Sequence, residues 1–342
     1  MTANDAENWA ESTAEETQRE RAAGRTPASE NPWYLLATVA GEQSEDRFDE
    51  ELHARNRRVW NGWACQNLSN EQLPKLAADA GIKEADLEPW NADEQAFVEG
   101  VFRQKGFSIP SADQPIYLRS AFFAKPFFMQ AFVFPSAVSF TNSHFSSKVV
   151  LSHSVIMQPA EFELAVFTDL ILRGTTFLDS VSLTASRINR TCHFNSTQFM
   201  GQANFDQAEF HGHAQFENLE FHGPTSFDRA GFLSRCDFYA SNFFMHVFFS
   251  PVSFNSEVNF HDCHFHQSCD FKPDWVGDEI IPTQFLQSST FYNCEFLGVA
   301  DFRHVAFHQY VSFTRTKFKG FAYFSKSPFE KFCLSVNGLR DA

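Results

Sequence analysis

Phenylalanine recurs in this chain at steps of five and six residues that alternate, so the repeat is eleven residues long. The run is clearest in the middle of the sequence, at Phe194, Phe199, Phe205, Phe210, Phe216, Phe221, Phe227, Phe232, Phe238 and Phe243. An α-helix repeats every 3.6 residues and a β-strand every two, and neither produces this period. A fixed short repeat predicts a solenoid, in which successive turns of the chain stack on one another.

The repeat extends over most of the chain. It can be traced backward to Phe128 and Phe123 and forward to Phe329. Phe makes up 43 of the 342 residues, against 6 Tyr and 6 Trp, so one kind of ring fills one kind of position. Two residues before most of these large residues stands a small one, as at Ala214. We expect both residues of each pair to point into the solenoid.

This small-x-large-x-x pattern, clear in residues 202–210 (Gln-Ala-Asn-Phe-Asp-Gln-Ala-Glu-Phe), resembles the pentapeptide repeats in their Phe-rich variant. The resemblance covers about residues 121–330. It implies that family's fold, an all-β solenoid in the form of a right-handed quadrilateral β-helix with four short faces per coil. The number of repeats then predicts about nine coils.

Residues 22 apart should lie above one another, because four faces contain two repeats. Phe rings would then form dry columns, each ring burying on the order of 150 Å². The small residue of each pair lets the wall close beside the ring. The predicted structural core includes Phe194, Phe205, Phe216, Phe227, Phe238, Cys236, Cys263 and Cys269.

Residues outside the repeats divide into three segments. Residues 1–30 are rich in Ala, Glu, Thr, Ser and Arg, and we expect a disordered tail there. Residues 31–120 show helical spacing followed by a connection, and they predict a small α-helical N-terminal region that caps the β-helix. Residues 331–342 are expected to form a C-terminal cap or tail.

Two capping-box signals support helices in the N-terminal region. Ser69 is followed by Gln72, and Asn91 by Glu94, which is the spacing that satisfies the first free N–H groups of a helix. Gly81 and Gly106 are expected to end these two helices.

Charge is distributed unevenly along a chain whose net charge is −15. Residues 201–301 contain 14 acids and 3 bases, whereas residues 302–342 contain 7 bases and 2 acids. This balance disfavours direct binding of nucleic acid and favours a protein partner with a basic surface. Asp206 and Asp228 are 22 residues apart, so they should stack as a candidate partner-binding pair.

The repeat is interrupted once, at residues 272–284, where fourteen residues instead of five separate Phe271 from Phe285. The excess should leave the coil as a loop, and inserted loops on repeat scaffolds often carry recognition. Its candidate partner-binding residues are Asp274, Trp275, Asp278 and Glu279. The alternative is that Trp275, Ile280 and Ile281 fold back onto the solenoid.

The sequence predicts no catalytic residue, no metal site and no cofactor. Cys263 and Cys269 lie among His261, His264 and His266, as in a zinc site, but the register puts the cysteines inside the wall and the histidines outside. No nucleophile motif or phosphate-binding glycine loop is present. We therefore predict that the protein is not an enzyme.

The leading functional hypothesis is a non-enzymatic protein-interaction scaffold with an acidic rod-like surface. The resemblance adds a narrower form, a DNA mimic that acts on a topoisomerase, because some pentapeptide-repeat proteins do so. The alternative is a structural or membrane-peripheral scaffold that uses the basic C-terminal coil. A homodimer through one coil end is a further hypothesis. The N-terminus resembles no secretion signal, so we expect a cytoplasmic protein. The motifs Asn31-Pro-Trp-Tyr and Arg57-Arg-Val-Trp resemble N-terminal segments of bacterial pentapeptide-repeat proteins, and this resemblance implies a bacterial protein.

Overall fold

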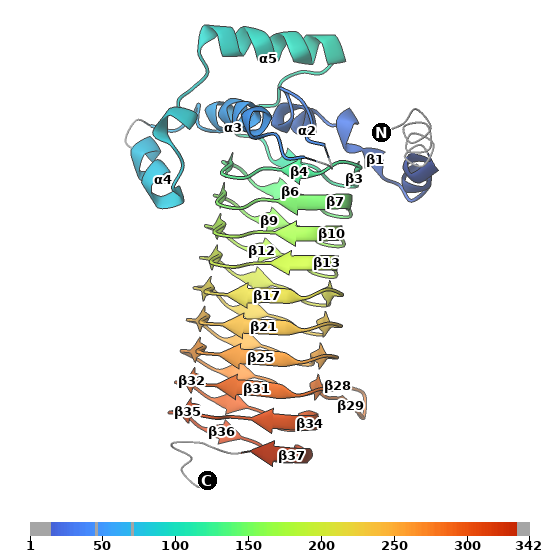
Figure 1. Ribbon diagram of the computed structural model, residues 1–342, viewed down its shortest axis with the longest axis vertical. Helices are drawn as coiled ribbons and strands as arrows, with labels where there is room; N and C mark the ends of the chain where they lie inside the picture. The colour runs from blue at the N-terminus through green and yellow to red at the C-terminus, as the bar shows by residue number, and fades with distance from the viewer. Residues whose placement is uncertain (1–14, 45–46, 70–71, 334–342) are drawn as a thin grey trace.

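Successive coils of the chain pair edge to edge as parallel strands, and together they form a long β-solenoid with helices at its N-terminal end (Figure 1). The computed structural model describes residues 15–44, 47–69 and 72–333. Repeat phenylalanines that are 22 residues apart are direct strand partners, as in the pairing of Phe216 with Phe238. The predicted 22-residue coil and the predicted β-solenoid of about nine coils are confirmed.

Each coil has four sides, which we call faces 1 to 4 in chain order. Faces 1 and 2 belong to one sheet of 16 described strands, face 3 is a sheet of nine, and face 4 is a sheet of ten. Face 1 contains β1 Thr26–Pro27, β3 Ala121–Phe123, β16 Glu209–Phe210, β20 Gly231–Phe232, β24 Ser253–Phe254 and β30 Gln284–Phe285. Face 2 contains β4 Phe127–Phe128, β17 Ala214–Glu217, β21 Cys236–Tyr239, β25 Val258–His261 and β31 Ser289–Tyr292.

Five longer strands run round the corner from face 1 to face 2. They are β7 His144–Val150, β10 Val166–Ile171, β13 Arg187–His193, β34 Ala306–Ser312 and β37 Phe329–Cys333. Face 3 contains β5 Val133–Phe134, β8 Val155–Ile156, β11 Thr176–Phe177, β14 Gln198–Phe199, β18 Glu220–Phe221, β22 Asn242–Phe243, β26 His264–Phe265, β32 Glu295–Phe296 and β35 Lys317–Phe318. Face 4 contains β2 Ile116–Tyr117, β6 Val138–Ser139, β9 Ala160–Glu161, β12 Val181–Ser182, β15 Ala203–Asn204, β19 Thr225–Ser226, β23 Val247–Phe248, β27 Cys269–Asp270, β33 Ala300–Asp301 and β36 Ala322–Tyr323.

The interior consists of ring columns. Phe194 stacks on Phe216 at 5.0 Å between centroids, Phe216 on Phe238 at 4.6 Å, and the ring planes are within 10° of parallel. Rings on face 4 meet these edge-on, as Phe205 meets Phe216 at 89°. Offset and edge-to-face contacts are the favourable arrangements of aromatic rings. The predicted core residues are all buried: Phe194, Phe205, Phe216, Phe227, Phe238, Cys236, Cys263 and Cys269.

The corners explain why steps of five and six residues alternate. A five-residue step turns through one residue in the left-handed conformation, and these residues are rarely glycine, as at Asn142, Leu164 and Arg229. A six-residue step uses an extra residue instead. Backbones approach closely at several of these corners, and a Cβ at Gly223 would lie 2.2 Å from the carbonyl oxygen of Gly201. Only glycine fits such a position.

The first coil begins earlier and in a different register from the one predicted. Strand β2 already belongs to face 4, so the solenoid starts at residue 116 rather than 121. The inward residue before Phe134 is Met129, which is fully buried, whereas Phe128 is partly exposed and contacts Phe48. The Phe128 assignment was wrong because Phe127, Phe128 and Met129 are all large and apolar, and only the step length distinguishes them.

Helices cover the N-terminal end of the solenoid (Figure 1). They are η1 Ala28–Glu30, α2 Pro32–Ala37, α3 Glu50–Ala64, α4 Gln72–Ala80, η2 Glu84–Asp86 and α5 Ala92–Lys105, and residues 15–22 are also helical. Both predicted capping boxes are present, at Ser69 with Gln72 and at Asn91 with Glu94. Gly106 ends α5 in the left-handed conformation.

Side chains of helix α3 form hydrogen bonds with backbone groups at the N-terminal edge of face 3. The Trp60 indole donates to the carbonyl oxygen of Val133 at 2.7 Å, and the Asn61 side chain accepts from the Val133 N–H and donates to the carbonyl of Ala131, both at 2.9 Å. The Asn31 side chain does the same for face 4 by donating to Tyr117. Unpaired strand edges invite association with other chains, and these side chains block that.

Residues 15–30 are ordered against the first coils, so the prediction of a disordered tail through residue 30 was wrong for this part. Strand β1 pairs with Ala121–Phe122 of β3. Glu20 is buried and accepts from Arg25 at 2.8 Å and from His144 at 3.0 Å. The polar composition is compatible with order here because the edge of the first coil supplies partners for these groups.

No described helix is both long enough and apolar enough to cross a bilayer. Of the predicted C-terminal segment, residues 331–333 lie in β37, which pairs with β34. Residues 334–342, including Leu334, lie outside the described residues.

Candidate functional site

The inserted segment forms a two-stranded antiparallel hairpin, β28 Asp274–Val276 and β29 Glu279–Ile281, which projects from the solenoid (Figure 1). Gly277 makes its turn with a φ of 62°. Trp275 is 56% exposed and Val276 54%, and the Trp275 ring meets the His304 ring edge-to-face, with 6.4 Å between the ring centroids. Trp275 and Ile280 are therefore exposed rather than folded back onto the wall, whereas Ile281 is partly buried, and the hairpin presents an apolar surface to solvent.

An ion pair joins the base of the hairpin to the same corner two coils earlier. The Arg229 guanidinium bonds to the carboxylate of Asp274. Arg229 occupies a left-handed corner between faces 4 and 1, where side chains extend away from the wall. The base of the hairpin thus lies against this corner.

The two stacked carboxylates predicted from the sequence lie beside this ion pair. The backbone N–H of Asp228 donates to Asp206 at 2.9 Å, so the two residues are in register. The pKa of Asp228 is raised by burial and by the negative charges of Asp206 and Asp274. The positive charge of Arg229 acts in the opposite direction, although the side chain of Asp228 has no hydrogen-bond or ion-pair partner among the described residues.

We call the group Asp206, Asp228, Arg229, Asp274 and Trp275 the hairpin corner. The sequence placed its acidic and aromatic members in two separate segments, and the structure brings them together. Asp278 and Glu279 lie at the far end of the hairpin, away from the wall. Arg229 was missed, although its position directly after the stacked Asp228 was a usable signal.

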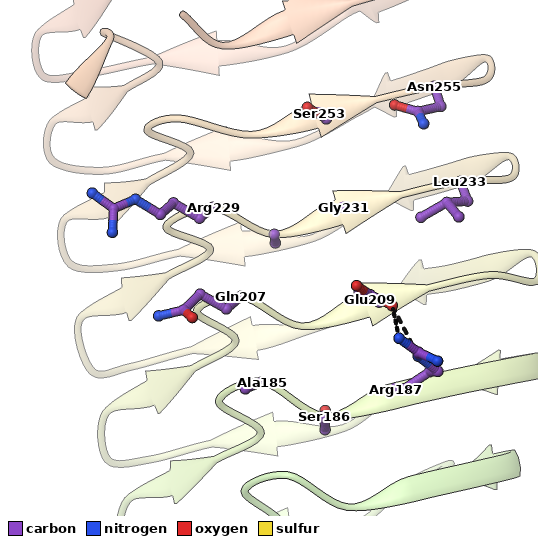
Figure 2. Close-up of a pocket in the computed structure, with 11 residues that line it drawn as sticks. Ala185, Ser186, Arg187, Gln207, Glu209, Arg229, Gly231, Leu233, Ser253 and Asn255 are labelled. Atoms are coloured by element: carbon purple, nitrogen blue, oxygen red, sulfur yellow. Dashed lines mark hydrogen bonds and ion pairs between the residues drawn. The ribbon is translucent and has the colours of Figure 1, made fainter. Parts of the chain in front are cut away.

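A polar hollow of about 540 Å³ lies on face 1 next to the hairpin corner (Figure 2). Its floor includes Gly231 and Ser253, which leave space where neighbouring coils carry longer side chains. Arg187 and Glu209 form an ion pair at one side, with nitrogen to oxygen distances of 2.8 and 2.9 Å. Figure 2 shows Arg229 at the corner, pointing away from Gly231. The hollow lies on the outer wall, and it offers donors and acceptors to a polar side chain.

The cysteines and histidines lie on opposite sides of the wall, as their register predicts. Cys263 and Cys269 are fully buried, and the Cys263 thiol donates to the carbonyl oxygen of Phe238 at 3.3 Å. Burial raises the pKa of the Cys269 thiol well above its usual value. His264 lies on the outer side of β26, above Asn242. In the described part of the chain, no group of three or more His, Cys, Asp or Glu side chains is arranged to hold a metal ion.

The fold defines the class of protein: a four-sided parallel β-solenoid whose interior is filled by stacked rings. A family model described as pentapeptide repeats, nine copies, matches residues 172–220 and 283–333. These residues of the solenoid are therefore pentapeptide repeats. No curated protein and no solved structure matches it. A solenoid of this kind fits a protein-interaction scaffold.

Proposed function

We propose that this protein is a non-enzymatic interaction scaffold whose hairpin corner binds a protein partner with a basic surface. The observation that carries the proposal is that an exposed Trp275 and the carboxylate of Asp228, which forms no ion pair among the described residues, meet at one corner of the solenoid. Tryptophan is the most enriched residue at interaction hot spots. A partner Lys or Arg would neutralise Asp228 while an apolar patch covers Trp275.

The interior supports a scaffold rather than an enzyme. Rings and small side chains fill it, so chemistry at an enclosed site has no room there. In the hollow on face 1, the charges of Arg187 and Glu209 neutralise each other in an ion pair. A cytoplasmic location is part of the proposal, and free buried thiols such as Cys192 and Cys236 support a reducing compartment.

A DNA mimic that acts on a topoisomerase is the narrower form of the proposal. The stacked Asp206 and Asp228 support it, as does the excess of acids in residues 201–301. Ion pairs such as Asp270 with Lys272 and Asp301 with Arg303 weigh against it, because they neutralise the same face. Inhibition of gyrase supercoiling at micromolar protein would support mimicry, and unchanged supercoiling would remove it.

The wider proposal is tested by affinity capture with matched variants. Trp275→Ala should weaken binding of the captured partner by tenfold or more, since hot-spot truncations cost about 2 kcal/mol or more. Leu233→Ala, which removes another exposed apolar side chain from face 1, is the control and should bind normally. Equal capture by wild type and Trp275→Ala would contradict the proposal.

A hairpin-free variant strengthens this experiment. Deleting residues 273–281 restores a coil of 22 residues, and Pro282→Asn supplies a residue that tolerates the left-handed corner. Thr283 must stay, because its buried hydroxyl donates to the carbonyl of Phe249 at 2.7 Å. This variant should fold and lose the partner.

A further inference from the structure

The last coil with described side chains, residues 307–328, differs in charge from all of the acidic middle of the solenoid. It contains four bases, Arg315, Lys317, Lys319 and Lys326, and no acid. Arg315 and Lys326 occupy left-handed corners, and Lys317 is the outward residue of β35 on face 3. The bases therefore surround faces 3 and 4 at one level of the solenoid.

Only part of this positive charge is neutralised by neighbours. Lys319 pairs with Glu295 of the coil before it at 2.8 Å. Arg315 lies over the Tyr292 ring and donates to its hydroxyl at 2.6 Å, a contact that leaves its charge intact. Lys317 forms no ion pair but lies beside the same Glu295, its strand partner, whose charge it shares with Lys319. Lys326 has no ion pair among the described residues. The coil thus retains a net positive charge.

Aromatic rings are exposed between these bases. Phe321 is 64% exposed, the highest value among the large apolar side chains of the described chain, and Tyr323 is 38% exposed. The two rings lie nearly parallel, 6.2 Å apart. Phe321 has no polar atom, so exposure in water brings it no hydrogen bond and its burial elsewhere would be favourable. We call Arg315, Lys317, Lys319, Phe321, Tyr323 and Lys326 the terminal belt.

The position of the belt at one end of the solenoid indicates which kind of anionic partner it could contact. Strands β34 to β37 lie at the end of the solenoid opposite to the helices (Figure 1). Coils are spaced by about 4.8 Å, and the Debye length at physiological salt is about 8 Å. A planar anionic surface at this end would meet the belt first. Of the acids in residues 201–301, only Glu295 and Asp301 lie one coil away, and both are ion-paired, with Lys319 and Arg303, whereas the others lie two or more coils away, beyond the screening distance. A long polyanion lying along the solenoid would instead be repelled by residues 201–301.

We propose that the terminal belt binds the anionic surface of a lipid bilayer, with the solenoid standing end-on. The lysines and arginines would contact lipid phosphates, and Phe321 and Tyr323 would enter the interfacial region, where aromatic rings are favoured. This surface is separate from the hairpin corner. The scaffold would then hold its partner at a membrane.

The test is sedimentation of the full-length protein with vesicles of phosphatidylcholine, with and without an equal share of phosphatidylglycerol. The wild type should bind only the anionic vesicles and should be released at about 1 M salt, where the Debye length falls to about 3 Å. Lys317→Gln with Lys319→Gln should weaken binding about 25-fold, because each basic residue near such a surface contributes about fivefold. Phe321→Ser should weaken it by a similar factor.

The matched control is Arg187→Gln with Arg190→Gln. It removes the same charge and also breaks ion pairs, with Glu209 and Asp169, but several coils away from the belt. It should bind vesicles like the wild type. Equal loss in the control and belt variants would overturn the proposal, as would binding that is independent of phosphatidylglycerol.

A competition arm separates lipid from nucleic acid. A single-stranded oligonucleotide added in excess should leave vesicle binding unchanged. Displacement of the protein by the oligonucleotide would assign the belt to nucleic acid and overturn the lipid proposal. Normal partner capture by the belt variants would show that the hairpin corner is intact, so the two proposals fail independently.

Discussion

At the scale of single residues, the inward positions do more than fill space. Where a five-residue step turns a corner, the small inward side chain often carries a hydroxyl that donates to a carbonyl of the previous coil, as Ser154 does to Met129 and Thr197 to Leu172, both at 2.6 Å. Cys263 and Cys294 occupy the same positions and donate through sulfur. These cysteines are therefore substitutes for serine, and their burial follows from that structural role.

The fit of these positions gives a direct prediction. Ala214 is fully buried between Cys192 and Cys236 of the neighbouring coils. Ala214→Leu should lower the free energy of unfolding by about 1 to 3 kcal/mol, since a packed interior has no space for the added carbons. Glu217→Leu, on the outer side of the same strand, should have a much smaller effect. Thermal melts compare the two variants, and equal melting temperatures would contradict the inward assignment.

At the scale of elements, α3 is the part of the cap that binds the solenoid most directly. His53 of α3 is buried and its Nε2 donates to the carbonyl of Gln130 at 3.1 Å. Burial and the nearby Arg57 lower its pKa from 6.5 to about 4. The folded cap therefore holds His53 neutral, whereas the unfolded chain takes up a proton below pH 6.5.

A pH dependence of the cap follows from this shift. Stability is fully present above pH 6.5 and falls as the pH drops toward 4, by about 2 kcal/mol between pH 7 and pH 5. Hydrogen exchange of the α3 amides measures this opening. His53→Gln keeps a donor for Gln130 and should remove the dependence in this interval. A slope equal to that of the wild type would show that other groups cause it.

The elements also show where sequence reasoning succeeds and where it stops. The stacking of Phe194 and the residues 22 positions further on could be predicted because the alternating five- and six-residue steps add up to one coil every four steps. The capping box of Asn91 and Glu94 could be predicted because it involves only residues close in sequence. The sequence did not predict that residues 15–30 are ordered. Their buried Glu20 is paired with His144, which is distant in sequence, and with Arg25, which lies in the same polar segment and gave no signal of its own. Only part of the candidate site could be predicted. The inserted segment with Trp275 was recognised from the sequence, but the ion pair of Arg229 with Asp274 depends on the direction in which the hairpin leaves the wall.

At the scale of the whole molecule, each coil contacts little beyond its two neighbours. Stability in such a solenoid is approximately a sum over coils and the interfaces between them. The pairing registers are uniform through the middle of the chain, with strand partners 22 residues apart from β13 to β24. A whole coil should therefore be removable without loss of the fold.

Deletion of residues 206–227 tests this modular behaviour. It places Asp228 directly after Phe205, in the position that Asp206 occupied, and every later side chain keeps its face. The shortened protein should remain soluble and melt cooperatively, with the same circular dichroism per residue. Deletion of residues 206–225, two fewer, puts Phe227 two residues after Phe205 and should prevent folding. Folding of both variants would contradict the coil assignment.

The hairpin shows how the wall responds to added chain. Ser253 pairs with Gln284, which is nine residues further along than the usual partner, and Val258 then pairs with Ser289 in the same offset. The coils above and below thus remain aligned although one corner contains extra sequence. This corner is a natural display position: a foreign peptide placed between Lys272 and Pro282 would be held outside a rigid rod, at a known height and on a known side.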